Sequence, residues 1–175
     1  GLALLAGATV ALADSNDLDD YRGYLGVRIG GSFFTNGAMR DYFGNGKIAL
    51  GISPVSTTTS EGWKLGTDLD FQFADRNGNR LLLIPLTFGV SKAFGDRQGE
   101  TQPYVSVRAG VAYADYGITD RFNVRNTGRR VIPTANAAVG VVFSKRMKLE
   151  LRYDWFAKTD GFQFDAVQVS LSYGL

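Results

Sequence analysis

Histidine and cysteine are both absent from the 175 residues of the chain. Without cysteine there can be no disulfide and no thiolate metal site. Without histidine, Ser-His-Asp and Cys-His catalysis, histidine-ligated zinc and the usual proton shuttle at neutral pH are excluded. No motif selects a nucleophile or a set of metal ligands. We therefore expect no catalytic residues, no metal and no cofactor.

Long apolar runs are missing as well. No stretch reaches the roughly 20 apolar residues that a transmembrane helix requires. The formal net charge is only +2 and no run of basic residues is present, so nucleic acid is not an expected partner. Proline is scarce, with 4 residues, whereas glycine is abundant, with 22. This composition is typical of closely spaced strands and turns in one domain.

The N-terminal segment has the character of an export signal. Residues 1–13 are apolar and uncharged and end in Ala11-Leu12-Ala13, which fits the small-residue pattern before a signal-peptidase cut. We interpret residues 1–13 as the remainder of a cleaved signal peptide without its basic start, 14–20 as an acidic leader and 21–175 as one β-barrel domain. An N-terminal helix packed on the domain is the alternative.

The strongest secondary-structure signal lies at residues 147–157. Two sets of side chains alternate there: Met147, Leu149, Leu151, Tyr153 and Trp155 on one side, and Lys148, Glu150, Arg152 and Asp154 on the other. A period of two with one apolar side indicates a β-strand, because a helix would mix the two sets around its circumference.

The same alternation recurs along the chain. It is visible at 21–33, 47–53, 62–74, 82–90, 103–114, 131–143 and 162–175. Between these stretches we expect a helical turn near 39–43, a tight hairpin at Asn77-Gly78, a bulge or strand end near Pro85 and an irregular connection at 115–130. The pattern predicts an all-β fold, an eight-stranded antiparallel up-and-down transmembrane β-barrel.

The polar side of the strands should face the inside of this barrel. That side is rich in small residues, such as Gly26, Gly66 and Gly140, and a narrow lumen needs small residues between large ones. A Lys or Arg that faced lipid at the midplane would cost about 2–4 kcal/mol. Aromatic residues near the strand ends on the apolar side would form interfacial girdles. The alternative is that they belong to the core of a soluble sandwich or barrel.

The charged residues of the polar side form a predicted network in the lumen. Its members are Arg22, Arg28, Asp68, Asp70, Arg108, Lys148, Glu150, Arg152 and Asp154. The third and seventh strands of an eight-stranded barrel lie opposite each other, so we expect Asp68 and Asp70 to reach Lys148 and Arg152. Exchanging Asp70 and Arg152 together should then restore stability that either single change removes.

Three stretches carry a resemblance to a known family: P-Y-V-S-V-R-A-G-V-A-Y at 103–113, L-E-L-R-Y at 149–153 and V-Q-V-S-L-S-Y-G-L at 167–175. The chain resembles small bacterial outer-membrane β-barrel proteins of the OmpA-like and opacity-type group. The resemblance implies a place in the outer membrane of a Gram-negative cell envelope, with both termini in the periplasm. It also implies that the barrel-assembly machinery reads the last strand, where Leu175 replaces the usual terminal Phe.

With this topology the connections at 35–46, 75–79, 115–130 and 158–161 would be extracellular. We expect a non-enzymatic protein with a filled polar lumen and a role in envelope integrity or surface contacts. Its partners would be outer-membrane lipids and lipopolysaccharide, whose phosphates suit the guanidinium groups of Arg121, Arg125, Arg129 and Arg130. The alternative for this segment is a solvated loop.

Other functions remain open from the sequence. A narrow, porin-like pore or a conduit for small hydrophobic molecules would need a continuous gap through the lumen. A soluble exported barrel that binds a lipophile, as lipocalins do, would have the opposite facing of its side chains. A membrane-embedded hydrolase or acyltransferase would have Ser and Asp available but no histidine as a base, and no motif selects a nucleophile.

Overall fold

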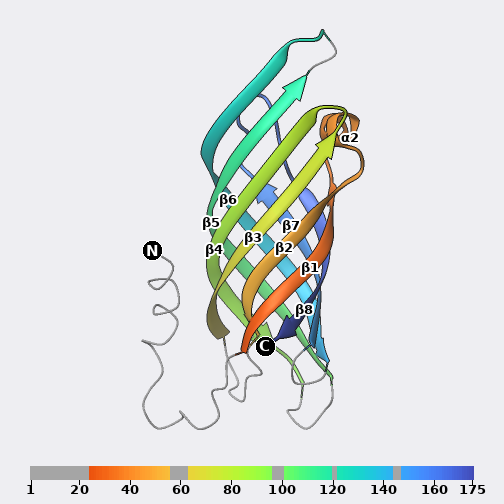
Figure 1. Ribbon diagram of the computed structural model, residues 1–175. Coiled ribbons are helices and arrows are strands. Elements are labelled where there is room, and N and C mark those ends of the chain that lie inside the picture. The colour runs from red at the N-terminus through yellow and green to blue at the C-terminus, as the bar shows by residue number, and fades with distance from the viewer. Residues whose placement is uncertain (1–23, 56–62, 96–100, 120–121, 144–146) are drawn as a thin grey trace.

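The computed structural model describes residues 24–55, 63–95, 101–119, 122–143 and 147–175. Eight antiparallel strands form a closed barrel in chain order, each strand pairing with the next and the last with the first (Figure 1). The strands are β1 (Tyr24–Phe34), β2 (Gly46–Val55), β3 (Trp63–Arg76), β4 (Asn79–Ala93), β5 (Thr101–Thr119), β6 (Arg125–Phe143), β7 (Met147–Phe156) and β8 (Ala166–Gly174). The predicted eight-stranded up-and-down barrel is confirmed.

Each of the eight ladders keeps one register along all its paired residues, so the described strands contain no bulge. The prediction of a bulge or strand end near Pro85 is wrong. β4 continues through Pro85, which pairs with Ala112 of β5. Pairing with β3 stops at Leu86 and resumes at Leu83 in the same register. Proline removes one backbone donor, and the neighbouring ladders hold the strand in line.

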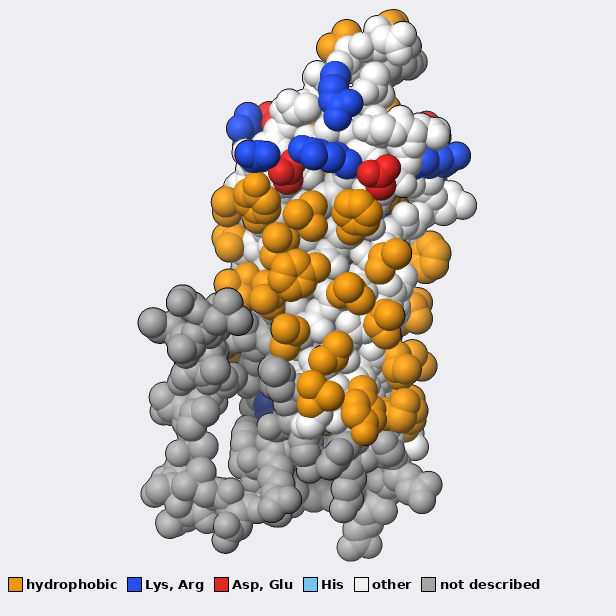
Figure 2. Space-filling view, viewed as in Figure 1, with side chains coloured by type: hydrophobic (Ala, Val, Ile, Leu, Met, Phe, Trp, Pro, Cys, Tyr) orange, Lys and Arg blue, Asp and Glu red, His pale blue; other side chains and the backbone are white. Residues whose placement is uncertain are grey.

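The outward side chains of the barrel wall are mainly apolar, whereas the buried polar and charged side chains lie inside. The exposed outward side chains include Val27, Ile29, Phe33, Ile48, Leu50, Ile52, Leu65, Phe71, Phe73, Phe88, Val107, Val111, Val139, Leu149, Leu151, Val169 and Leu171. On the face seen in Figure 2, apolar side chains form a broad band, with charged side chains gathered above it. A soluble lipid-binding barrel would have the reverse arrangement.

The height of this band matches a bilayer. Along β3 the outward side runs from Trp63 to Phe73. At about 3.3 Å per residue and a strand tilt of about 40°, this stretch rises about 25 Å, which is the height of the apolar band of outer-membrane barrels. Exposed aromatic side chains lie toward both ends of the band: Phe33, Phe73, Tyr113 and Trp155 toward one end, and Trp63 and Tyr173 toward the other.

The connections at one end of the barrel have defined structure. Asn36 caps the helix α2 (Gly37–Phe43) by accepting a hydrogen bond from the Ala38 amide. The β3–β4 hairpin turns at Asn77 and Gly78, both with positive φ, as the sequence predicts. None of the described helices is long and apolar enough to cross a bilayer.

The predicted irregular connection at 115–130 is wrong for most of its length. β5 continues to Thr119 and β6 begins at Arg125, and Asp115 pairs with Arg129 in the same ladder. This hairpin rises beyond the other strands (Figure 1). The alternation of apolar and polar residues is lost there because neither face of the hairpin needs to contact lipid. The strand pairing itself does not depend on that alternation.

Candidate functional site

The lumen is the most organised polar site of the molecule, and Arg28 lies at its centre. Its guanidinium contacts three carboxylates: Asp70 at 2.5 Å, Asp68 at 3.3 Å and Glu150 at 3.4 Å. β1, β3 and β7 provide these residues, so the ion pairs cross the lumen. The Arg28 side chain is fully buried.

Arg152 of β7 forms a second centre beside Arg28. Its guanidinium lies 2.6 Å from Asp70 and 2.8 Å from Asp154. It also donates a hydrogen bond of 2.9 Å to the side-chain carbonyl of Gln168. Asp70 therefore lies between two arginines, and the contact between β3 and β7 predicted from the sequence is present.

The network continues toward the end of the barrel where the chain terminates. Glu150 accepts a hydrogen bond of 2.5 Å from the hydroxyl of Tyr104 and lies 3.4 Å from the Lys148 ammonium. Asp68 lies 3.3 Å from Arg108. We call the interior around Arg28, Asp70, Glu150 and Arg152 the charged tier of the lumen.

The buried charges of the described residues balance. The five buried cations are Arg28, Lys47, Arg108, Lys148 and Arg152, and the five buried carboxylates are Asp68, Asp70, Glu150, Asp154 and Asp165. A buried charge without a partner is expensive, whereas paired and hydrogen-bonded charges are tolerated. The balance therefore permits this much charge in an interior that is closed off from water. In the described part of the chain, no group of acidic side chains is arranged to hold a metal ion.

Two glycines show how the lumen accommodates its large side chains. A Cβ atom at Gly51 would collide with the carboxylate of Asp70 and lie 3.0 Å from the guanidinium of Arg28. A Cβ at Gly140 would collide with the ring of Tyr104. Both glycines lie opposite a large side chain of the charged tier, which is why inward-facing positions alternate between small and large residues.

The lumen is apolar toward the end that carries α2. Phe34, Met39, Phe43, Leu81, Leu83, Tyr116, Ile118, Phe156 and Phe164 are buried there in one cluster, which we call the apolar tier. Met39 and Phe43 come from α2, so the helix contributes its apolar face to the closure. The alternation in the sequence predicts a lumen that is polar along its whole length, and for this tier that prediction is wrong.

Lys47 lies at the boundary between the two tiers. Its ammonium is 4.9 Å from the ring centre of Phe34 and 5.1 Å from that of Phe156, and it donates to the Phe164 carbonyl at 3.4 Å. Asp165 ties the β7–β8 connection to the wall: one of its carboxylate oxygens accepts from the Phe156 amide, and its carbonyl accepts from the Thr35 amide.

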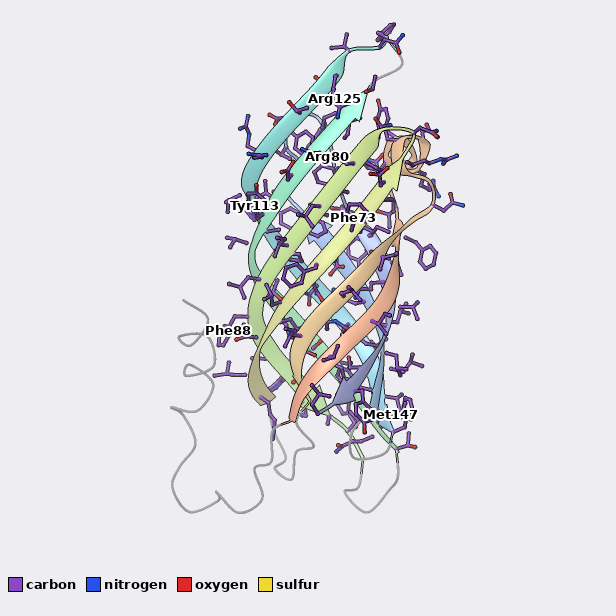
Figure 3. All side chains as sticks on the ribbon, in the orientation of Figure 1. Phe73, Arg80, Phe88, Tyr113, Arg125 and Met147 are labelled. Carbon is purple, nitrogen blue, oxygen red and sulfur yellow. The ribbon has the colours of Figure 1, made fainter. Side chains whose placement is uncertain are left out.

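A rim of charged side chains lies just beyond the apolar band. On the outer face, Asp115 is 3.6 Å from Arg80 and 3.0 Å from Arg129. Arg130 instead lies 3.4 Å from Asp160, which also accepts a hydrogen bond from the hydroxyl of Tyr116. Figure 3 places Arg80 and Arg125 at this end, beyond Tyr113, whereas Phe88 and Met147 lie toward the opposite end.

The structure brings together eight of the nine predicted lumen residues: Arg28, Asp68, Asp70, Arg108, Lys148, Glu150, Arg152 and Asp154. Arg22 lies outside the described residues. Lys148 pairs with Glu150 and not with Asp68 or Asp70, because it lies nearer the end of the barrel. Lys47, Gln72, Tyr104 and Gln168 also belong to the lumen, and their positions on the inward side of their strands could have identified them.

The four arginines predicted as a surface anion contact do not form one group. Arg125 and Arg129 lie on the outer face of the hairpin, Arg130 pairs with Asp160, and Arg121 lies outside the described residues. Arg80 of β4 joins Arg129 at Asp115, which the sequence could not show because 49 positions separate the two arginines.

No protein-family model and no curated protein sequence matches the chain. Solved structures share its fold. The N-terminal β-barrel domain of Pseudomonas aeruginosa OprF matches with a TM-score of 0.53 and 13% identity over 89% of this chain and 99% of that chain. The outer membrane enzyme PagL matches with a TM-score of 0.55 and 11% identity, covering 86% of this chain and 99% of that chain.

The attachment invasion locus protein Ail of Yersinia pestis matches with a TM-score of 0.53 and 13% identity, covering 87% of this chain and 99% of that chain. At such identities the likeness establishes the fold alone. The chain has the fold of small eight-stranded outer-membrane β-barrels, as its sequence resemblance predicted. Because an enzyme is among these structures, the fold itself does not decide between catalytic and non-catalytic functions.

Proposed function

We propose that the protein is an integral outer-membrane β-barrel with a side-chain-filled lumen and a non-enzymatic role in the cell envelope. The inside-out distribution of its side chains carries the proposal. Large apolar side chains are exposed around the wall, whereas Arg28, Glu150 and Arg152 are at most 1% exposed in the interior. Hydrocarbon is the one solvent in which this arrangement is favourable.

The lumen works as a plug in this proposal. A water-filled channel would leave its lining accessible to solvent, yet the charged tier has almost no exposed surface. The apolar tier is equally closed, with Leu81, Leu83, Phe156 and Phe164 at 0% exposure. Both observations favour a plug over a porin-like pore and over a conduit for small hydrophobic molecules.

The absence of enzymatic activity is the second part of the proposal. The sequence has no histidine to serve as a base. The inward serines, including Ser32, Ser53, Ser170 and Ser172, are buried among the lumen side chains and out of reach of a lipid substrate. The role that remains is mechanical or adhesive: a stable barrel that presents α2 and the β5–β6 hairpin beyond the apolar band.

Cell fractionation and heat-dependent gel mobility test the membrane assignment. The full chain, expressed in a diderm host, should be recovered with the outer membrane and should require detergent for extraction. Unboiled samples should migrate as a folded barrel and shift after boiling, since a closed barrel resists mild detergent. Recovery in the aqueous fraction without detergent would overturn the assignment.

Conductance in planar bilayers separates the plug from a pore. The purified barrel should give no unitary current steps. A variant that removes two large side chains of the apolar tier, Phe156→Ala with Phe164→Ala, should remain closed because the charged tier still fills the lumen. Regular current steps from the unaltered protein would contradict the proposed plug and favour a pore.

Site-specific labelling tests the orientation. The chain has no native cysteine, so Asn126→Cys reports on the hairpin and Thr101→Cys on the opposite end. A maleimide that cannot cross the membrane should label Asn126→Cys on intact cells, and Thr101→Cys only after the outer membrane is opened. The reverse pattern would place the hairpin in the periplasm.

A further inference from the structure

Three arginines converge on the outer face of the β4–β5–β6 wall. Arg80 belongs to β4, and Arg125 and Arg129 belong to β6. Between them β5 contributes Asp115 and Gly117. A Cβ at Gly117 would lie 3.2 Å from the guanidinium of Arg125 and 3.6 Å from the side chain of Arg80. Gly117 is buried beneath these side chains, and its lack of a Cβ lets the Arg125 guanidinium and the aliphatic part of Arg80 lie close to the strand.

The charge of this cluster is unbalanced, unlike that of the lumen. Arg80 and Arg129 share the single carboxylate of Asp115. Among the described residues, no carboxylate forms an ion pair with Arg125. Asp75 of β3 lies directly opposite Arg80 on the same outer face, so three cations and two carboxylates leave a net charge of +1. The side chains of Arg80 and Arg129 are 55% and 71% exposed, so they can turn toward a ligand.

The cluster lies directly above the apolar band. Two residues further along the same faces are Leu82, Tyr113 and Val131, below Arg80, Asp115 and Arg129 respectively. Two residues of a strand correspond to about 7 Å. Val131 is 68% exposed and Tyr113 is 37% exposed. A molecule that contacted both the arginines and the apolar residues below them would need an anionic group a few ångströms from a hydrocarbon part.

We infer that Arg80, Arg125 and Arg129 bind the phosphate of a membrane lipid headgroup, whose acyl chains lie along Leu82, Tyr113 and Val131. Guanidinium groups pair with phosphate through two parallel hydrogen bonds, which favours phosphate over a compact neutral headgroup. The site opens sideways from the wall toward the surrounding lipid, so the phosphate belongs to a lipid rather than to a soluble anion. This inference rests on the proposed membrane location.

Native mass spectrometry of the full chain in a maltoside detergent tests the site, with diphosphoryl lipid A and its dephosphorylated analogue as probes. The unaltered protein should retain the phosphorylated lipid at least 10-fold better than the analogue. The triple variant Arg80→Gln, Arg125→Gln, Arg129→Gln should lose most of this selectivity. The matched control, Arg40→Gln, Arg76→Gln, Lys158→Gln, removes the same charge from the same end and should keep selectivity within about twofold.

Equal losses in the triple variant and in the control would overturn the site, because binding would then depend on overall charge. Retention of the analogue as strong as that of lipid A would overturn it as well. Inorganic phosphate that competes at the concentration of the lipid would show that a soluble anion is the ligand, against the inference. A heat-dependent gel shift of each variant shows that it is folded. Loss of that shift in the unaltered protein would instead mean failure of the proposed membrane barrel.

Discussion

The charged and apolar tiers of one lumen are closed by opposite means. In the charged tier, Arg28 and Arg152 are surrounded by carboxylates and held by directional contacts across the barrel. In the apolar tier, phenylalanine and leucine side chains fill the space by packing alone. The two tiers meet at Lys47, whose ammonium faces aromatic rings.

The difference between the two tiers shows which part of the lumen determines the arrangement of the strands and which part tolerates substitution. A buried charge network contributes little net stability compared with well-packed apolar residues, but loss of one partner is costly because the other charge is left unpaired. Apolar packing tolerates exchange between residues of similar volume. We therefore expect the charged tier to fix which strands face each other and the apolar tier to tolerate substitutions.

The largest effect should come from removing one charge of the central pair. Arg152→Gln leaves Asp70 and Asp154 without their shared cation, and Asp70→Asn leaves Arg28 and Arg152 facing each other. Each should destabilise the barrel by about 3–5 kcal/mol. The double variant should cost clearly less than the sum of the two, because neutrality is restored. Urea unfolding in lipid vesicles provides the measurement; additive effects would contradict the network.

The structure changes the expected outcome of exchanging these two charges. Asp70 contacts Arg28 as well as Arg152. An arginine at position 70 would therefore lie against Arg28. Exchange of Asp70 and Arg152 should therefore restore only part of the lost stability. The double variant Asp70→Asn with Arg152→Gln, which places no charge beside Arg28, is the better test.

Truncation in the apolar tier should have the next largest effect. Phe164→Ala removes a side chain that is 0% exposed and should cost about 3–4 kcal/mol through lost burial and the remaining cavity. Phe164→Leu should cost less than about 1.5 kcal/mol. The same unfolding assay checks both, with the outward Phe88→Leu as a control of small effect. A Phe164→Leu variant as unstable as Phe164→Ala would show that the tier is not tolerant.

Two glycines provide a matched test of space in the charged tier. Gly51→Ala should cost about 1–3 kcal/mol because its methyl group would displace Asp70 from Arg28. Gly66→Ala, also within a strand, has no atom within 4 Å of the added Cβ and should be neutral or slightly stabilising. Equal losses of stability at both positions would mean that glycine is required for backbone conformation and not for space in the lumen.

The smallest change in stability should follow Asp115→Asn, because an exposed ion pair contributes only about 0.2–1 kcal/mol. Its effect on lipid binding should be larger. The variant raises the net charge of the arginine cluster from +1 to +2 and frees Arg80 and Arg129 from the carboxylate of Asp115. Retention of diphosphoryl lipid A should increase several-fold by native mass spectrometry. Weaker retention would show that Asp115 positions the arginines.

The fold could be predicted from the sequence because a barrel wall repeats one rule at every strand. The alternation at Lys148, Glu150, Arg152 and Asp154 gives both the strand and its inward side. The alternation ends where the strands extend beyond the apolar band, because the two faces of a strand there no longer contact lipid and lumen. The sequence therefore predicts an irregular loop beyond Tyr113, although the strands of this hairpin pair as regularly as those below.

The contacts within the lumen were only partly predictable. Alternation places a side chain inside but does not give its height along the axis, which depends on the stagger between strands. The alternation thus predicts that Lys148 contacts Asp68 and Asp70, whereas its ammonium forms an ion pair with Glu150. The apolar tier was missed because Leu81 and Leu83 interrupt the pattern of β4, and such an interruption does not show which face is apolar.

The unbroken register of all eight ladders restricts how this protein can change in length. Deletion of a single codon within β7 would turn the charged side chains on one side of the deletion from the lumen toward hydrocarbon in one step. Each lipid-facing Lys or Arg near the midplane would then cost about 2–4 kcal/mol. Descendants of this gene should therefore gain or lose wall residues in even numbers, while single insertions accumulate at the hairpin tips.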